Sequence, residues 1–370
     1  MLTGARGKAV LTKIKASAPK RKPPTKTLLQ PSPAQKPLKP ASFIPRSRAP
    51  PVPTVVYQDR AVMVLNKPAG LISQAAKEEY GLGIYSMGSW IDAYCDKFSP
   101  SEKPKTVHRL DKATSGAFIL AKTIHAGHDL SRQFQQRTVG KTYLAVVAGV
   151  PSTRSGRMSS RLTVDDDGRP VEVNVKPTLK DATHEDEDLE GRLAEADWEV
   201  LASSKNLLDH GVSLLRLQLL TGHKHQLRIQ LASILKTPVF GDRLYGGSHL
   251  ASLEPGSLPA ALRNHLFLHA SSLALDRYAK TGRKIRLHVS VPPPRYFVHL
   301  CDAADIKHAL TYVERYGGLS LGGIDIDFSD DARKKEVAET LGGVWMPDMD
   351  VKVKQPKRST NKYDSSVLDG

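Results

Sequence analysis

Short apolar runs that end in turn residues recur through the middle of the chain and predict β-strands. The run at 61–65 passes directly into a turn at 66–70 that contains proline and glycine, and a second strand is expected at 117–122. The run at 117–121 is expected to be a buried strand. Further strands are expected at 141–149, 214–220, 267–270 and 285–289.

Apolar residues at helical spacing separate these strands. Ala, Leu and Phe recur at i, i+4 and i+8 between 126 and 134, and another apolar stripe runs through 225–235. Residues 84–98 and 303–316 are also expected to be helical. Because helices and strands do not alternate strictly, the pattern favours the α+β class, with a mixed or antiparallel central sheet and flanking helices.

Composition divides the chain into three parts. Residues 1–53 are crowded with proline and basic residues and cannot bury enough apolar surface to fold, so we expect them to be disordered. Residues 54–300 are expected to form the globular domain, with an acidic surface insertion at 181–197 and a proline run at 292–294 that closes its core. Residues 301–370 are expected to form a C-terminal extension that is partly helical and then disordered.

The net charge of +16 favours a polyanionic partner, either nucleic acid or an anionic membrane surface. Twelve basic residues and no acidic residue lie within 1–53, which leaves a net charge of +4 for the rest of the chain. A folded part with so small a net charge must bind a polyanion through a localised groove.

The N-terminal residues also bear on cellular location. Residues 1–18 contain no acid and are rich in Ala, Lys, Ser and Thr, as in a mitochondrial transit peptide. The basic run at 19–22 leaves a nuclear signal open, and a flexible RNA-binding arm of a cytoplasmic protein is the other alternative. We expect a mitochondrial protein.

Several classes of protein find no support in the sequence. Cys95 and Cys301 are too few and too far apart for a disulfide framework or a zinc site, and they fit a reducing compartment. No stretch approaches the roughly 18 apolar residues of a membrane span, so we expect no membrane insertion. His223 and His225 lie close together, but without a third ligand nearby they do not predict a metal site.

Candidate chemistry is concentrated in residues 107–116. Arg109 and Asp111 lie two positions apart, just before two hydroxyl residues and a glycine, and an apolar run follows at once. A charge beside a buried strand costs on the order of several kcal/mol unless it has a partner or a function. Asp111 is therefore the first candidate for a catalytic residue.

Arg228 is the second candidate, because apolar residues border it on the helix predicted at 225–235. Such an arginine either extends to solvent or pairs with a carboxylate. With Asp111 available, we expect the two to pair. The guanidinium would then lower the pKa of the carboxyl and hold it ionised, as a nucleophile or base requires.

The stretch His108–Asp111, followed by Thr114–Gly116, resembles the central motif of the RluA-like family of RNA pseudouridine synthases. Three further blocks resemble that family's motifs and occur in its order, so that the likeness extends over residues 54–291. These blocks are 57–59 with 65–71, then 141–145, then 220–228 with 241–246.

This resemblance implies a reaction and a set of roles. Asp111 would act at the ribose while the C1′–N1 bond breaks, and the detached uracil would turn over and rejoin through C5 without metal, redox step or organic cofactor. Tyr143 would lie against the flipped base, unless it is an ordinary sheet aromatic. Arg109 would enter the stack that the extruded uridine leaves, unless it only contacts a phosphate. Arg228 would pair with Asp111.

The same resemblance places further residues among those that bind RNA or the base. Lys67 would support the site or touch a phosphate, and Gly116 would supply backbone freedom or close approach. Thr114 and Ser115 are capping groups or substrate contacts. The last member of this set, His108, belongs to the motif itself.

Three departures from the family pattern bear on RNA binding and target choice. His223 stands where the family usually has arginine, Gln230 stands where histidine is common, and residues 73–74 replace the usual histidine after the first block. The leading target is mitochondrial large-subunit ribosomal RNA, with transfer RNA as the alternative.

Two other classes of function remain open. A non-catalytic RNA-binding assembly factor could keep the fold, although it has no use for the set formed by Asp111, Tyr143 and Arg228. A hydrolase such as a phosphatase normally requires a cluster of acidic residues that binds a metal, whereas the residues around Asp111 are basic.

Overall fold

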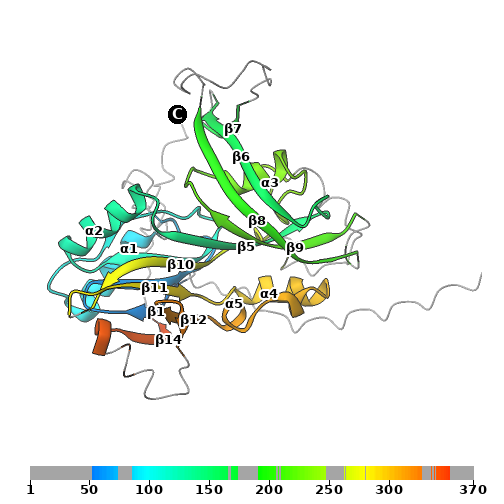
Figure 1. Cartoon of the computed structure of the whole chain (residues 1–370). Coiled ribbons are helices and arrows are strands. Elements are labelled where there is room, and N and C mark those ends of the chain that lie inside the picture. Colours follow the sequence, from blue (N-terminus) through cyan, green and yellow to red (C-terminus); the bar gives the residue numbers. More distant parts are fainter. Residues whose placement is uncertain are drawn as a thin grey trace, which may run out of the picture. The chain divides into compact units, whose positions relative to one another are not determined.

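Fourteen strands of the computed structural model join in one continuous sheet (Figure 1). The structure describes residues 52–73, 86–165, 168–173, 191–205, 207, 210–246, 262, 264–279, 281–326, 335, 337 and 339–350, of which 344–350 as backbone only. The segment 1–53, expected to be disordered, lies almost wholly outside the described residues, as does the end of the predicted extension after 350.

The strands are ordered β14-β1-β2-β4-β10-β5-β9-β8-β6-β7, while β11, β12 and β13 continue from β10 and β3 pairs with β4. Among the described strand pairs only β4 and β10 run parallel, so the expected mixed sheet is confirmed. The bounds are β1 Thr54–Gln58, β2 Val62–Lys67, β3 Lys105–Thr106, β4 Ser115–Ala121, β5 Gly140–Ala148, β6 Ser155–Val164, β7 Pro170–Glu172, β8 Arg192–Ser204, β9 Val212–Leu219, β10 Leu268–Tyr278, β11 Lys284–Ser290, β12 Gly318–Leu321, β13 Ile324–Asp325 and β14 Val344–Asp350.

Three of the expected helices are confirmed: α1 Met87–Phe98, α2 Ile124–Gln135 and α3 Gln226–Ser233. Side-chain caps define where the first two begin. Ser86 Oγ accepts from Ser89 N, and Thr123 Oγ1 accepts from Ala126 N, so each satisfies a backbone donor that lacks a partner in the first turn.

The helix expected at 303–316 is wrong. The segment divides into α4 Arg295–Ala303, a 3₁₀ turn η3 Lys307–Ala309 and α5 Tyr312–Tyr316. Asp305 breaks the helix with φ of 56°. Thr311 then starts α5 through a capping box with Glu314.

The acidic insertion expected at 181–197 is also wrong for its second half, because β8 begins at Arg192. Ala194, Ala196 and Trp198 point into the core, while the intervening residues face outward. Residues 181–190 lie outside the described part. Nor does the proline run at 292–294 end the sheet, since β12 pairs with β11 and β14 pairs with β1 further along the chain.

Strand β4 lies in the middle of the sheet and is buried along its whole length, as its apolar run predicts. It carries Gly116, whose φ is +124°, at the point where β4 meets β10. A Cβ on Gly116 would lie 2.1 Å from the Ala270 carbonyl oxygen, so only glycine permits this approach. The role predicted for Gly116 is therefore close approach of two strands, rather than a contact with RNA.

Replacing Gly116 with alanine is expected to lower the free energy of unfolding by about 2–3 kcal/mol, from backbone strain and overpacking. Urea denaturation of both chains measures the difference. Gly282→Ala is the matched control, because Gly282 also has a positive φ, of 81°, but nothing lies within 4 Å of its added Cβ. Equal losses in the two variants would contradict the close-approach argument.

Candidate active site

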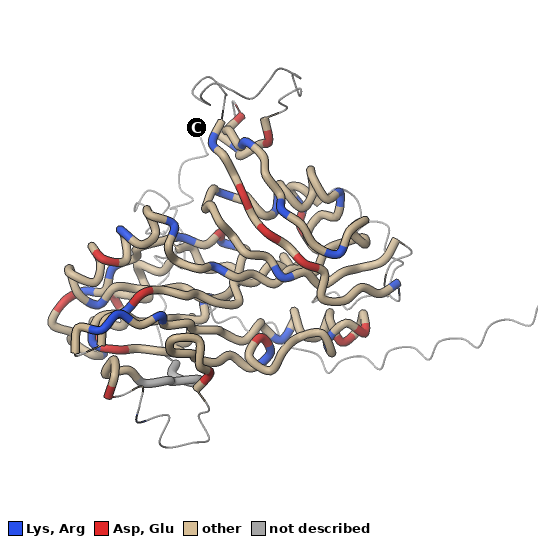
Figure 2. Tube along the Cα trace, in the orientation of Figure 1, with Lys and Arg blue, Asp and Glu red and all other residues tan. Residues whose placement is uncertain are grey.

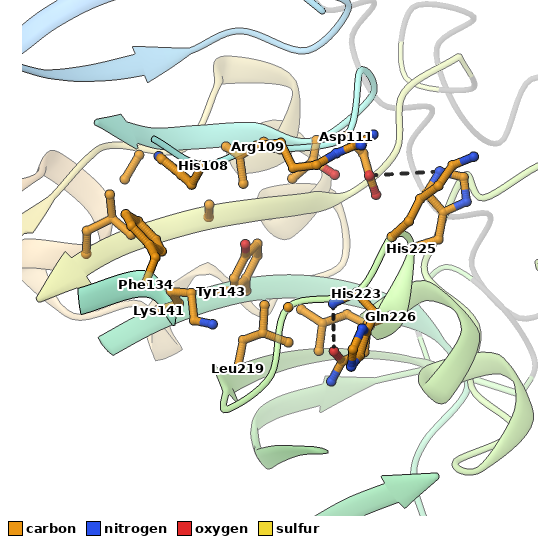
Figure 3. Close-up of a pocket in the computed structure, with 18 of the residues that line it drawn as sticks. His108, Arg109, Asp111, Phe134, Lys141, Tyr143, Leu219, His223, His225 and Gln226 are labelled. Atoms are coloured by element: carbon orange, nitrogen blue, oxygen red, sulfur yellow. Dashed lines mark hydrogen bonds and ion pairs between the residues drawn. The ribbon is translucent and has the colours of Figure 1, made fainter. Parts of the chain in front are cut away.

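An open cavity of about 430 Å³ lies over β5 and β10, between the loop that leads into β4 and the loop that leads into α3 (Figure 3). Much of its lining comes from the motif blocks of the sequence. The stretch 107–111 forms one wall and 222–228 the other, and the strand residues Lys141 and Tyr143 lie between them.

Asp111 is half-buried in the cavity wall, with its side chain 18% exposed. Backbone hydrogen bonds hold its loop: Thr114 N donates to Asp111 O at 3.1 Å, and Gly70 N donates to Lys112 O at 2.6 Å. Ser73 Oγ adds a double contact, because it donates to Leu110 O at 2.6 Å and accepts from Leu110 N at 3.1 Å. The carboxylate is thus carried on a loop with little freedom to move.

The pair predicted between Arg228 and Asp111 is wrong. Arg228 instead forms a bidentate ion pair with Asp242, with Nε and the second guanidinium nitrogen each 2.7 Å from a carboxylate oxygen. Burial opposes the charge on Arg228, but the hydrogen bonds and charge of Asp242 outweigh it, so the pKa of Arg228 is raised. Burial likewise opposes the charge on Asp242, and the guanidinium outweighs it and lowers the pKa.

His225 is the residue that faces Asp111, with Nε2 3.9 Å from Oδ1 (Figure 3). It stands just before α3 in the left-handed region, with φ of 58°, and this conformation turns its ring towards the cavity. Its Nδ1 lies 2.9 Å from the hydroxyl of Tyr245. Burial lowers the pKa of His225, and the charge of Asp111 partly opposes that shift.

Tyr143 lies on β5 at the floor of the cavity, nearly buried (Figure 3). Burial raises the pKa of its phenol, and the negative charge of Asp111 raises it further. The side chain therefore presents a protonated phenol and an aromatic ring close enough to Asp111 to feel its charge. This arrangement is compatible with the predicted contact to a flipped base.

Lys67 does not face solvent, so the phosphate contact considered for it is wrong. The side chain is fully buried, and its Nζ donates to the carbonyl oxygens of Pro68 at 3.0 Å and Leu71 at 2.9 Å. A weaker contact at 3.5 Å reaches Lys112 O, next to Asp111. Lys67 therefore ties the turn after β2 to the loop of Asp111, which is the supporting role that was the other prediction.

Burial lowers the pKa of Lys67 to about 7, against the opposing charge of Asp111. The unfolded chain binds this proton more tightly, so the stability of the wild type is expected to rise relative to Lys67→Met as pH increases from 7 to 10. The relative gain should be about 1.4 kcal/mol per pH unit at most. Urea denaturation of both chains across this range measures it, and parallel pH curves would contradict it.

The remaining residues predicted to bind RNA are mostly part of the fold. His108 stacks between Phe118 and Phe134, at 4.5 and 4.8 Å between ring centroids, and its Nε2 accepts from Ile119 N at 2.9 Å. Burial, aided by the charge of Lys141, lowers the pKa of His108 to about 3, so its ring is neutral.

Thr114 and Ser115 are buried, and Ser115 Oγ lies 3.0 Å from His269 Nδ1. The Ser115 hydroxyl is thus engaged within the fold, whereas Thr114 lines the cavity and its substrate contact stays a prediction. Arg109 differs from them because it is exposed at the cavity beside Asp111. The prediction that Arg109 enters the base stack stays a prediction.

The three departures from the family pattern have structural partners here. His223 Nε2 lies 2.8 Å from Leu193 O on β8. Gln230 is fully buried, and its amide donates to Ala194 O at 2.9 Å and Ser160 Oγ at 3.1 Å. Ser73 holds the backbone of the Asp111 loop, as described above. His223 and Gln230 thus fasten one cavity wall to β6 and β8, and Ser73 joins two loops at the other wall.

Basic residues surround the cavity. Among the described residues that line it, Asp111 is the only acidic one, whereas the basic ones are Arg109, Arg137, Lys141, Arg192, Lys224 and Arg228. Burial and the neighbouring charge of Arg137 lower the pKa of Lys141 to about 8. Figure 2 shows basic residues also along β6 and β8, interspersed with acidic ones. The cavity is therefore a localised positive site, which suits a polyanion.

The described residues contain no group of three or more His, Cys, Asp or Glu side chains that could hold a metal ion. Within the same part of the chain, no helix is long and apolar enough to cross a membrane.

Sequence reasoning missed Asp242 and Tyr245, although both lie in the block 241–246. It also gave His225 no role. An acid between a glycine and a basic residue gives no sign of its partner, and the helix that carries Arg228 ends at Ser233, so helical spacing does not relate it to Asp242. The available signal was that His225, Asp242 and Tyr245 are polar residues within two neighbouring motif blocks, 220–228 and 241–246.

Comparison with known proteins gives one consistent result. Residues 61–233 match the family described as RNA pseudouridylate synthase. The chain is 36% identical over 219 residues to RNA pseudouridine synthase 4, mitochondrial, of Arabidopsis thaliana, a match that covers 54% of this chain and 42% of that protein. It is 30% identical over 274 residues to the mitochondrial pseudouridylate synthase RPUSD4 of Bos taurus, covering 68% of this chain and 69% of that protein.

Bacterial and structural relatives agree. The dual-specificity RNA pseudouridine synthase RluA of Escherichia coli K12 is 30% identical over 226 residues, which cover 61% of this chain and 87% of that protein. The solved structure of human RNA pseudouridylate synthase domain containing 4 superimposes with a TM-score of 0.51 at 26% identity, covering 68% of this chain and 93% of that one.

Proposed function

The chain belongs to the RNA pseudouridylate synthase family, and we propose that its substrate is a uridine of mitochondrial large-subunit ribosomal RNA. As a member of that family it is an isomerase that converts uridine to pseudouridine in RNA. Two things support a mitochondrial target: two relatives carry the word mitochondrial in their names, and residues 1–18 have the composition of a transit peptide.

The observation that carries the catalytic proposal is the position of Asp111. A carboxylate held on a fixed loop, in a basic cavity that has no other acid among its described lining residues, can stabilise positive charge that develops at C1′ as the C1′–N1 bond breaks. Tyr143 lies beneath the base that turns over. Arg109, exposed at the same wall, fills the space that the uridine leaves in the RNA stack.

Arg228 has a different role from the one first expected. It pairs with Asp242, whose Oδ1 accepts from Leu244 N at 2.9 Å and Tyr245 N at 3.1 Å. The pair therefore shapes the turn that carries Tyr245, and Tyr245 in turn holds His225 opposite Asp111. Arg228 is a positioning residue for the site.

Target choice is tested with transcripts tritiated at uridine C5, because pseudouridine formation releases that tritium. Mitochondrial large-subunit ribosomal RNA is expected to release tritium, and mitochondrial and cytosolic transfer RNAs are compared at the same concentration. Release from transfer RNA alone would assign the chain to that class of substrate. Binding of all transcripts with no release from any would favour the non-catalytic assembly factor.

Location is tested separately. Residues 1–53 fused to a fluorescent reporter are expected to direct it to mitochondria. A diffuse cytosolic or nuclear signal would contradict the mitochondrial part of the proposal and leave the isomerase assignment intact.

A further inference from the structure

The His225 ring is fixed by two neighbours and is left with one nitrogen facing the cavity. Nδ1 lies 2.9 Å from the Tyr245 hydroxyl, and Nε2 lies 3.9 Å from Asp111 Oδ1. The side chain is 15% exposed, at the edge of the space between Asp111 and Tyr143 (Figure 3). At 3.9 Å Asp111 is too far for a hydrogen bond, and no other described residue bonds to Nε2, so this nitrogen is available to a substrate.

The hydrogen bonds of Tyr245 determine which nitrogen carries the proton. Its hydroxyl donates to Pro170 O at 3.1 Å, and a carbonyl oxygen can only accept. The single hydroxyl hydrogen is thereby used, so towards His225 the tyrosine oxygen accepts and Nδ1 must be the donor. A neutral imidazole protonated at Nδ1 has its basic lone pair on Nε2, which faces the cavity.

The Tyr245 ring is itself firmly held. Asp242 accepts from Tyr245 N, and the Arg228 guanidinium lies over the Tyr245 ring, 5.1 Å from its centroid. Arg228 holds Asp242, Asp242 holds the backbone of Tyr245, and Tyr245 contacts His225 Nδ1. These three residues thus fix the direction of His225 Nε2. A histidine that only filled space would not need its ring orientation fixed by these contacts.

Burial and the charges around His225 together lower the pKa of its ring, which favours the neutral form. Burial lowers its pKa most, the negative charge of Asp111 opposes this, the positive charges of Arg228 and Lys224 lower it further, and Asp242 opposes. Tyr143, by contrast, has its pKa raised and keeps its phenolic proton, so it cannot accept another. Asp111 is engaged at the ribose. The other two histidines of the cavity lining have their Nε2 atoms engaged, His108 by Ile119 N and His223 by Leu193 O, so His225 is the neutral histidine whose Nε2 faces Asp111.

We propose that His225 Nε2 is the general base that removes the C5 proton of the rejoined uracil. The proposal rests on the isomerase activity assigned above. When C5 bonds to C1′, it still carries its hydrogen and the ring holds an N1=C6 double bond. Nε2 takes the C5 proton, the C5–H electron pair becomes the C5=C6 bond, and the N1=C6 pair passes to N1. N1 takes up a proton from solvent, and the imidazolium returns its proton to solvent.

The test uses His225→Asn, whose amide nitrogen can still donate to Tyr245 while the Nε2 lone pair is lost. Single-turnover conversion is measured on an RNA that the wild type converts, with protium or deuterium at uridine C5. The variant is expected to be about 100-fold slower, as loss of a general base implies, and to show a larger primary deuterium isotope effect than the wild type. RNA binding is measured in parallel and should be unchanged.

Further variants keep the test decisive if Asn is too disruptive. His225→Ala is expected to regain rate on addition of imidazole, with the isotope effect returning towards the wild-type value. His223→Asn, from the same loop, should leave the isotope effect as in the wild type and show no imidazole rescue. A His225→Asn rate equal to wild type would overturn the proposal. A slower rate with an unchanged isotope effect and no rescue would also overturn it and leave His225 a positioning residue.

Failure of this proposal and failure of the assigned activity look different. If the wild type itself releases no tritium from any RNA, the isomerase assignment is wrong and the base assignment falls with it. If the wild type releases tritium and His225→Asn does so equally fast, only the base assignment is wrong.

Discussion

Asp111→Asn is expected to lower the single-turnover rate of pseudouridine formation by at least about 10⁴-fold, as loss of a central catalytic group does. Asparagine keeps the size of the side chain but has no charge with which to stabilise a cationic C1′. Because the loop of Asp111 is held by backbone and Ser73 contacts, the variant should fold and bind RNA as the wild type does.

The measurement is tritium release from C5-labelled RNA, with RNA binding measured in the same preparation. Asp92→Asn is the matched control, since Asp92 is an exposed acid that forms an ion pair with Lys103 on the surface. It should retain full rate. Wild-type rate in Asp111→Asn would show that another group carries the reaction.

Arg228→Met is expected to lower the free energy of unfolding by about 3–5 kcal/mol, because it leaves the buried carboxylate of Asp242 without its partner. A double-mutant cycle measures the pairing. Arg228→Met and Asp242→Asn should show strong coupling, with the double variant less destabilised than the sum of the two.

The corresponding cycle between Arg228→Met and Asp111→Asn separates the observed pairing from the one predicted from sequence. It should show coupling well under 1 kcal/mol, because the two residues share no direct contact. Stronger coupling with Asp111 than with Asp242 would contradict the arrangement described here. Urea denaturation supplies all six free energies.

The partner of Arg228 was beyond what the sequence could establish. Helical spacing shows that the arginine has apolar neighbours, so that it either extends to solvent or pairs with an acid. It does not say which acid, because Asp111 and Asp242 each approach from a different loop. The choice depends on how the turn after Val239 folds against α3, a long-range packing event.

The predictions of a phosphate contact for Lys67 and of a surface insertion at the start of β8 were wrong for related reasons. A lysine before a turn is normally solvated, yet here inward-facing carbonyls of that same turn take up the ammonium group. In β8, acidic residues alternate with apolar ones, so a strand that is polar on one face can be taken for an acidic loop. Strands buried on both faces, such as β4, carry no such ambiguity and were predicted correctly.

The most direct test of the central claim is to incubate the purified wild-type chain with RNA tritiated at uridine C5 and then analyse the nucleosides of the digested RNA. Tritium should be released in step with the appearance of pseudouridine, and both should be absent with Asp111→Ala. RNA that is bound but yields neither tritium nor pseudouridine would contradict the claim that this cavity isomerises uridine.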